Sequence, residues 1–122
     1  SELIMNDYSQ VSRNIGKNIG GIENTYKKVT LNDHASINNN ESNMYSSAIH
    51  NWGSGSLVIN SNTVEISENI GHSSEYPAVT FTKQNNLIGS LTISPPSDLN
   101  KIITGNINEN IENPNEILLI DN

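Results

Sequence analysis

Apolar side chains recur every three or four residues near the start of the chain, at Ile4, Tyr8, Val11, Ile15, Ile19, Ile22, Tyr26 and Val29. This spacing predicts one face of a long amphipathic helix over residues 4–29. Gly16, Gly20 and Gly21 fall inside it, and each costs roughly 1 kcal/mol relative to alanine in a helix interior. The predicted helix therefore depends on packing against a partner surface. Its candidate interface residues are Ile15, Ile19, Ile22 and Tyr26, and either Ile15→Asp or Ile22→Asp is expected to unfold the domain.

The next part of the chain changes to strand-like and polar patterns. Residues 30–51 are mostly polar with isolated apolar positions, which predicts a long loop that crosses a surface. Apolar and polar residues then alternate in SLVIN and TVEIS. This alternation predicts a β-hairpin over residues 56–67, with Ser61 and Asn62 in its turn.

The last third of the chain predicts short elements. Residues 78–92 fit either a strand or a short helix, and SLTIS at 90–94 predicts a strand. A short helix is expected at 97–104, and the apolar run EILLI at 116–120 predicts a central strand covered on both faces. Residues 1–122 are thus expected to form one α+β domain, in which the long N-terminal helix packs on a small antiparallel β-sheet and a final strand ends the chain.

The only tryptophan stands beside a glycine directly before the predicted hairpin, in HNWGSGSLVIN. Because glycine lets backbone and ring approach closely, Trp52 and Gly53 are expected to anchor the preceding loop onto the sheet. An ordinary core tryptophan is an equally good interpretation, and the two are compatible.

Composition narrows the class of function. The formal net charge is −7 with six cationic residues, which argues against a nucleic-acid partner because such a partner requires clustered cations. The chain has 22 asparagines and 16 serines, which predict a polar, turn-rich surface. Isoleucine occurs 17 times but phenylalanine and tryptophan once each, so a thin core of β-branched aliphatic residues is expected. The absence of cysteine excludes a disulfide framework.

No catalytic or metal-binding motif is found in the sequence. The three histidines are too scattered for a metal site: His34, His50 and His72. Two carboxylate pairs lie in polar sequence that would leave them solvated: Glu65 with Glu68, and Glu109 with Glu112. No serine occupies a strand-turn-helix nucleophile position. We therefore expect a non-enzymatic protein without catalytic residues, cofactor or metal.

The order of these elements resembles the globular domain of type IVb pilins. IGGIENTYKKVT is similar to the end of the pilin N-terminal helix, and HNWGSGSLVIN to a tryptophan-glycine element before a strand. EYPAVTFTKQ, SPPSDLNKII and NEILLI are similar to the family's later helices and final strand. The chain departs from these pilins in lacking their disulfide, whose first cysteine would fall near Phe81 and whose second would fall in or after residues 97–104.

The resemblance implies a structural subunit of a type IV pilus or a related secretion filament, such as a minor pilin that initiates, caps or regulates the fibre. Its partners would be other pilin subunits and the pilus assembly machinery. A further N-terminal helix of about 20 or more apolar residues would anchor it in the bacterial inner membrane, facing the periplasm, before it joins a pilus on the cell surface.

Two other classes of function remain open. The first is a surface adhesin or phage receptor-binding module that recognises glycan or protein through loops rich in asparagine, serine and aromatic residues. The second is a secreted effector or its immunity protein, for which small size and acidity are suitable. The helical stripe discriminates between them and a pilin, because an all-β adhesin would not begin with a long helix.

Overall fold

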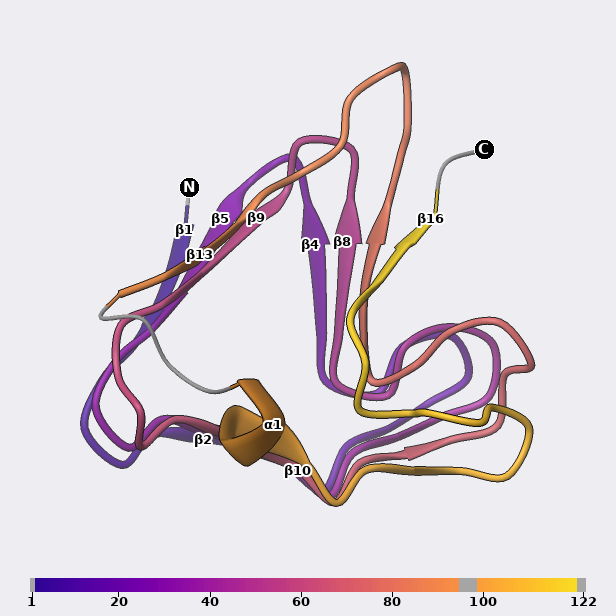
Figure 1. The fold of residues 1–122 in the computed structure, drawn as a ribbon, viewed down its shortest axis with the longest axis horizontal. Coiled ribbons are helices and arrows are strands. Elements are labelled where there is room, and N and C mark those ends of the chain that lie inside the picture. The colour runs from indigo at the N-terminus through magenta and orange to yellow at the C-terminus, as the bar shows by residue number, and fades with distance from the viewer. Residues whose placement is uncertain (1, 95–98, 121–122) are drawn as a thin grey trace.

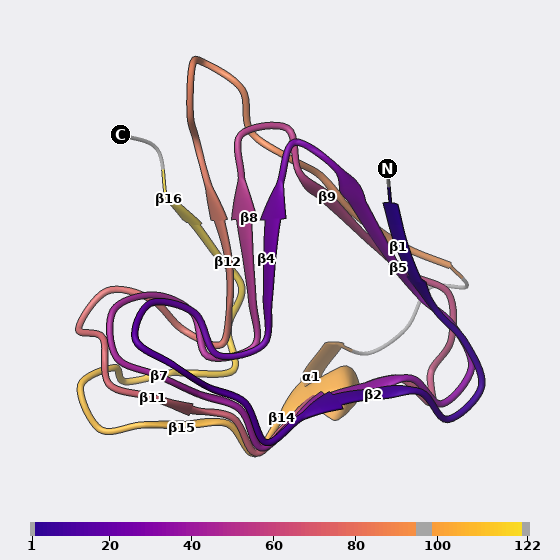
Figure 2. The ribbon, with the colours of Figure 1, turned by 180° about the vertical axis from the view of Figure 1, so that it is seen from behind.

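The chain forms a parallel β-helix, in which each of four successive coils contributes one strand to each of four parallel sheets (Figures 1 and 2). The computed structural model describes residues 2–94 and 99–120. Sheet A contains β1 (Glu2–Met5), β5 (Lys28–Leu31), β9 (Ser56–Ile59) and β13 (Leu91–Ile93). Sheet B contains β2 (Gln10–Ser12), β6 (Ser36–Asn38), β10 (Glu65–Ser67) and β14 (Ile103–Thr104).

The other two sheets follow in the same order along each coil. Sheet C contains β3 (Ile15–Gly16), β7 (Glu41–Ser42), β11 (Ile70–Gly71) and β15 (Ile107–Asn108). Sheet D contains β4 (Ile22–Thr25), β8 (Ile49–Trp52), β12 (Val79–Thr82) and β16 (Leu118–Ile120). A single helical turn, α1 (Leu99–Ile102), precedes β14 in the last coil. It is the one helix within the described ranges, and it is far too short to cross a membrane.

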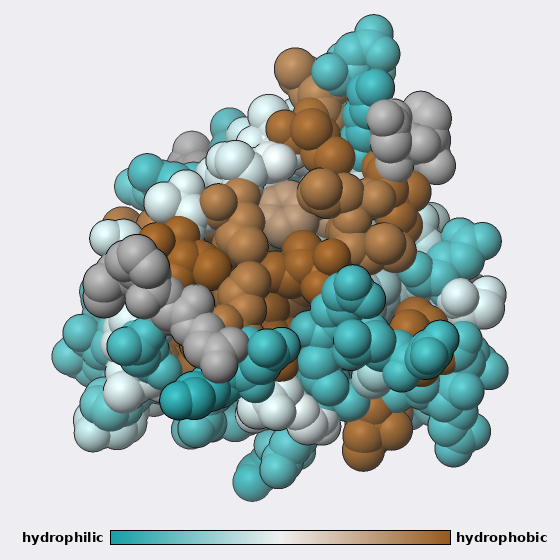
Figure 3. All heavy atoms as spheres, viewed as in Figure 1, coloured by the Kyte–Doolittle hydropathy of each residue, from teal (hydrophilic) through white to brown (hydrophobic). Residues whose placement is uncertain are grey.

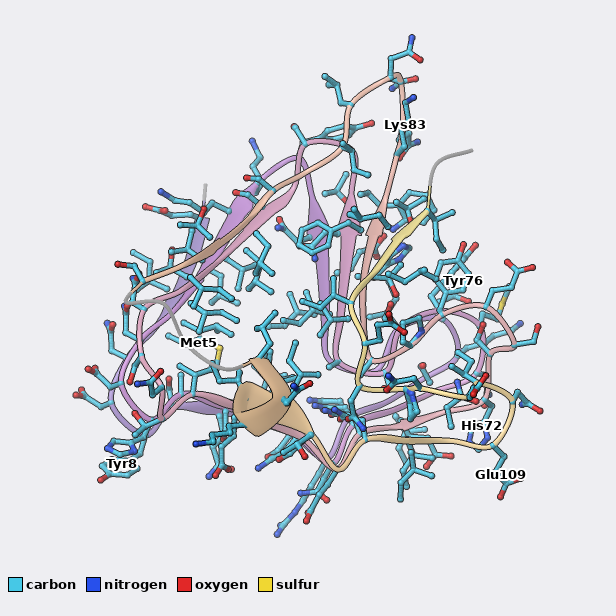
Figure 4. All side chains as sticks on the ribbon, viewed as in Figure 1. Met5, Tyr8, His72, Tyr76, Lys83 and Glu109 are labelled. Atoms are coloured by element: carbon cyan, nitrogen blue, oxygen red, sulfur yellow. The ribbon has the colours of Figure 1, made fainter. Side chains whose placement is uncertain are left out.

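The core lies between sheets A, B and D, and each inward position repeats from coil to coil. On sheet B the inward column is Val11, Ile37, Ile66 and Ile103. On sheet A it includes Met5, Leu31, Ile59 and Ile93, with the Met5 side chain directed into the interior in Figure 4. Most of these side chains are branched aliphatics that are fully buried, because a pleated surface packs them well. Figure 3 shows that apolar residues also cover the end of the β-helix that carries β13, α1 and β16.

The predicted N-terminal helix is wrong, and with it the α+β fold class and the pilin resemblance. Residues 2–25 form β1 to β4, each paired in parallel with the next coil. The three-to-four spacing arose because short strands separated by corners place apolar residues at irregular intervals. Ile15 is 82% exposed and Tyr8 74% exposed, so the stripe is not one buried face.

The glycines inside this segment serve close backbone contacts between coils. A Cβ on Gly20 would lie 2.4 Å from the carbonyl oxygen of Ser47, and one on Gly21 would lie 2.4 Å from that of Ala48. Side chains at these positions would therefore force adjacent coils apart. The residues that made the predicted helix costly are those that the β-helix requires.

The predicted hairpin is also wrong, although both of its strands exist. β9 pairs with β5 and β13, and β10 pairs with β6 and β14, so the two strands belong to different sheets. The predicted loop at 30–51 contains β6, β7 and most of β8. The segment at 78–92, for which a strand and a short helix were both open, contains the strand β12. The strand predicted at 90–94 is confirmed as β13.

The end of the chain differs from its prediction in position and in exposure. Of the helix predicted at 97–104, α1 forms over Leu99–Ile102, while residues 97 and 98 lie outside the described residues. The last strand of the described residues is β16, which pairs among them only with β12 and so forms an edge of sheet D. Because Leu119 is 62% exposed, β16 is not the central, doubly covered strand that its apolar run predicted.

Candidate functional site

A ladder of asparagines fixes the corner between sheets B and C. The residue before each asparagine has a left-handed backbone, with φ of 59° at Arg13, 56° at Asn39, 55° at Glu68 and 68° at Gly105. This conformation turns the chain sharply after sheet B and points the next side chain along the axis of the β-helix. The stacked residues are Asn14, Asn40, Asn69 and Asn106.

The three inner ladder asparagines, Asn40, Asn69 and Asn106, use both the oxygen and the nitrogen of their side-chain amides. The backbone N and Nδ2 of Asn40 both donate to Oδ1 of Asn69, at 3.0 Å each. The same two groups of Asn69 donate to Oδ1 of Asn106 at 2.9 and 2.8 Å, and Nδ2 of Asn69 also donates to the carbonyl oxygen of Ile37 at 3.0 Å. Asn115 completes the ladder by accepting both bonds from Asn106. The ladder holds the coils in register, so sheet C and the loops after it start from a fixed point.

The loops that connect sheet C to sheet D turn beyond sheet C and return alongside it to the first residues of the sheet D strands (Figures 1 and 2). We call residues 17–21, 43–48, 72–78 and 109–117 the C–D loops. They carry four serines and five asparagines, and their length differs from coil to coil. Their last residues reach the core, where Ala48 and Ala78 are buried, while their outer parts differ in length without changing the coil register.

An aromatic cluster packs the C–D loops onto β8. The ring of Tyr45 stacks on His50 with centroids 5.2 Å apart and meets Trp52 edge-on at 5.8 Å. Tyr76, from the next coil, meets Tyr45 and His50 edge-on at 5.0 and 5.4 Å. Such aromatic pairs contribute about 0.5–1.5 kcal/mol each beyond their buried area. The cluster therefore makes a rigid base beneath the loops.

His50 is fully buried in this cluster, and its Nε2 lies 2.8 Å from Oγ1 of Thr82. Its Nδ1 and the Nε1 of Trp52 are buried without a hydrogen-bond partner among the described residues. Burial lowers the pKa of His50 to about 4, because the surroundings disfavour its charged form. The pKa of Tyr76 is raised, chiefly by burial and then by the nearby Tyr45 and Glu75. The cluster is thus neutral at physiological pH.

Beside the cluster, the C–D loops of the last two coils enclose an open cleft of about 540 Å³. Three of its lining residues are apolar, Pro77, Ile111 and Leu118, and we call them the floor. Its rim carries three carboxylates and three smaller polar side chains: Glu75, Glu112, Glu116, Ser74, Asn110 and Asn113. The lining contains no cationic residue, so the cleft has a negative potential. A ligand with several hydroxyl groups and an apolar face fits this lining, whereas an anion does not.

The six residues proposed from the sequence do not form one site. Ile15 lies exposed on the outer face of sheet C, Ile19 lies half-buried in a C–D loop, and Ile22 packs partly on the core. The structure does bring Tyr26 and Gly53 together, since a Cβ on Gly53 would lie 2.2 Å from the Tyr26 ring. Both have positive φ, 61° and 56°, at the corner between sheets D and A.

Among the six residues proposed from the sequence, Trp52 has the contacts that most resemble its expected role as an anchor for a loop. Its ring contacts Tyr45 and His50, so it joins a C–D loop to sheet D. The expectation that Trp52 anchors a long loop stays a prediction, now applied to a shorter segment.

Because Ile15 is exposed, Ile15→Asp is no longer expected to unfold the domain. Ile15→Asp should change the free energy of unfolding by less than about 1 kcal/mol, because surface substitutions usually have small effects. The new carboxylate would stand opposite Glu41 on β7, so Ile15→Thr is the control that removes the apolar side chain without adding like-charge repulsion. Urea unfolding followed by circular dichroism measures both. Loss of the cooperative transition in Ile15→Thr would contradict this placement of the side chain.

The histidines and carboxylates considered from the sequence are spread over the molecule. No group of three metal-binding side chains occurs within the described residues. His72 lies 2.8 Å from Glu41 on the outer side of sheet C, and both are partly exposed. Of the two carboxylate pairs, only Glu112 lies in the cleft, because the lining does not include Glu109.

The sequence held one signal for this architecture that the helical interpretation missed. SRNIG, SENIG and TGNIN each contain a ladder asparagine after a left-handed residue, and NNNES occupies the equivalent place in the second coil. Equivalent asparagines are 26, 29 and 37 residues apart. Such self-similarity is typical of a solenoid.

Comparisons of the chain with protein-family models, curated proteins and solved structures found no match. The fold also separates the chain from the type IVb pilins, because it lacks their helix and their antiparallel sheet within the described residues.

Proposed function

We propose that this protein is a binding module, such as a surface adhesin or a phage receptor-binding module, that recognises neutral saccharides through the cleft in the C–D loops. The observation that carries the proposal is the lining of that cleft, where carboxylates and amides surround an apolar floor. Saccharides present hydroxyl groups around their edges and C–H groups on their faces. Carboxylate oxygens accept bonds from the hydroxyls, amides both donate and accept, and the floor packs against the C–H face.

The framework supports binding that needs little rearrangement. Asn110 Nδ2 donates to the carbonyl oxygen of His72 at 2.8 Å, which ties the last C–D loop to the previous one. Asn115, in the same loop, ends the asparagine ladder. Tyr76, which belongs to the aromatic cluster, lies in the chain between the lining residues Glu75 and Pro77. A loop held by such contacts loses little conformational entropy when a ligand binds.

The pilus-subunit interpretation is not carried forward, because the residues on which it depended form strands. The assembly partners and the membrane anchor were implied only by that resemblance. The effector alternative has no specific observation in its favour.

The proposal predicts a charge-selective pattern of binding. On a glycan array, the protein should bind neutral glycans and bind sialylated or sulfated glycans more weakly, because three carboxylates repel anions. Glu112→Ala should weaken binding to the best neutral glycan by about tenfold or more, since a hydrogen bond to a charged group contributes roughly 1.5–3 kcal/mol. Isothermal titration calorimetry measures the affinity.

Glu109→Ala is the matched control. Glu109 is an exposed carboxylate in the same loop but outside the lining, so its removal changes the net charge equally without touching the cleft. Equal affinities of wild type and Glu112→Ala would overturn the placement of the site. Binding restricted to anionic glycans would overturn the proposed ligand class. Mass spectrometry of the recovered glycan tests the non-enzymatic part of the proposal, which cleavage would contradict.

A further inference from the structure

The outer face of sheet B is a flat polar surface with a regular layout. The outward columns across the first three coils are Gln10, Ser36 and Glu65, and then Ser12, Asn38 and Ser67. Coils in a parallel sheet lie about 4.8 Å apart, and outward residues on one strand about 6.6 Å apart. The face therefore presents hydroxyl, amide and carboxylate groups on a fixed grid, in which Ser36 is only 6% exposed between Gln10 and Glu65.

An exposed aromatic platform stands at one end of this grid. Tyr8 and His34 precede the two columns and stack with ring centroids 4.5 Å apart and planes at 2°. Tyr8 is 74% exposed, and Figure 4 shows its side chain directed away from the body of the molecule. A large exposed aromatic ring beside polar groups is a common feature of binding surfaces, because it supplies apolar contact area with little loss of conformational entropy.

The turn beneath the platform is fixed by several hydrogen bonds. Asp7 and Asp33 both have left-handed backbones, with φ of 56° and 55°. The backbone N of Asp7 donates to Oδ2 of Asp33 at 2.9 Å, and the backbone N of His34 donates to the carbonyl oxygen of Asp7 at 2.8 Å. The stack is thus held by the backbone and does not depend on ring contact alone.

A shallow groove of about 190 Å³ joins the platform to the grid. Its lining takes in both rings and five polar side chains: Gln10, Ser36, Asn38, Thr63 and Glu65. Oδ1 of Asn38 is buried and has no hydrogen-bond partner within the described part of the chain. Buried acceptors are almost always satisfied in proteins, so the Asn38 side chain gains a hydrogen bond if its amide turns outward to a ligand donor in the groove.

From these observations we infer that an extended neutral saccharide chain binds along the outer face of sheet B, with one sugar ring on Tyr8 and its hydroxyl groups in the groove. A protein partner is the weaker candidate, because the face has no apolar pocket for an anchoring side chain. The groove is much smaller than the cleft in the C–D loops and lies on a different sheet, so it extends the proposed function to a second, independent site.

The test uses the full chain and a series of neutral linear oligosaccharides of increasing length, with affinity measured by calorimetry. Tyr8→Ala should weaken binding of the longest oligosaccharide by about tenfold or more, and Tyr8→Phe, which retains the ring, should restore most of the affinity. Chemical-shift changes on titration should include the backbone amides of Gln10, Ser36 and Asn38.

Ile15→Ala is the matched control, because it removes an equally exposed apolar side chain on sheet C. Equal affinity of wild type and Tyr8→Ala, without shifts on sheet B, would overturn this inference. If Glu112→Ala still weakened binding in that case, the proposed function would stand while the second site failed. If Tyr8→Ala alone weakened binding, the sheet B site would stand and the cleft would fail. Capture of a protein but of no saccharide at the Tyr8 surface would also overturn the inference.

Discussion

Asn69→Ala is expected to lower the free energy of unfolding by about 3–5 kcal/mol, a large part of the stability of a small domain. The substitution removes four hydrogen bonds in which the Asn69 side chain takes part: two accepted from Asn40, one donated to Ile37 and one donated to Asn106. Asn40 and Asn69 are fully buried, so water cannot replace the lost bonds. Each buried group left without a partner costs about 1–3 kcal/mol.

Asn32→Ala provides the matched control for this prediction. Asn32 stands in a second ladder, in which its Nδ2 donates to Oδ1 of Asn6 at 2.7 Å and its own Oδ1 accepts from Asn60 at 2.8 Å. This ladder is exposed to solvent, so its loss should cost less than about 1 kcal/mol. Urea denaturation followed by tryptophan fluorescence measures both variants. Equal costs for Asn69→Ala and Asn32→Ala would show that burial of the ladder does not contribute to stability.

The sequence predicted local properties of the chain better than it predicted their assembly. The strands at 56–59 and 65–67 were visible as short alternating runs, and the excess of isoleucine did predict a core of branched aliphatic residues. The two strands do not pair as a hairpin, because turn residues such as Ser61 and Asn62 can also form a corner, here between sheets A and B. In a β-helix every strand pairs with a segment one coil away, and no local signal names that partner.

The helical stripe failed for a related reason. The spacing of Ile15, Ile19 and Ile22 fits one helix face, but these residues lie on sheet C, in a C–D loop and on sheet D. The recurring ladder asparagine was the better evidence, since a repeat constrains the whole chain while a periodic stripe constrains one segment.

The cleft could not have been predicted from spacing. Its lining comes from residues 74–77 and 110–118, which lie in the C–D loops of two successive coils and at the start of β16. They meet because β11 pairs with β15 and β12 pairs with β16. Glu109 and Glu112 were considered as a pair on sequence grounds, whereas the structure separates them and brings Glu112 into one lining with Glu75.

Acidification from pH 6.5 to pH 4 is expected to destabilise the protein by about 3 kcal/mol through His50 alone. The pKa of His50 is about 4 in the folded state and 6.5 in the unfolded chain. Between these values the unfolded chain binds a proton that the folded protein does not bind, so the stability present above pH 6.5 is lost as the pH falls. Glu23, in register with His50 on β4, is exposed, so water screens its attraction for a charged imidazole.

His50→Phe isolates this contribution, because phenylalanine keeps a ring between Tyr45 and Trp52 but does not titrate. Near pH 7 the variant should be about 1 kcal/mol less stable than the wild type, since the Thr82 hydroxyl loses its partner. Its free energy of unfolding should then fall less steeply than that of the wild type between pH 6.5 and 4. The carboxylates titrate in both proteins and cancel in the comparison, and His34→Gln, at an exposed histidine, controls for removing an imidazole. Parallel pH profiles for wild type and His50→Phe would contradict this prediction, because they would mean that folding does not lower the pKa of His50.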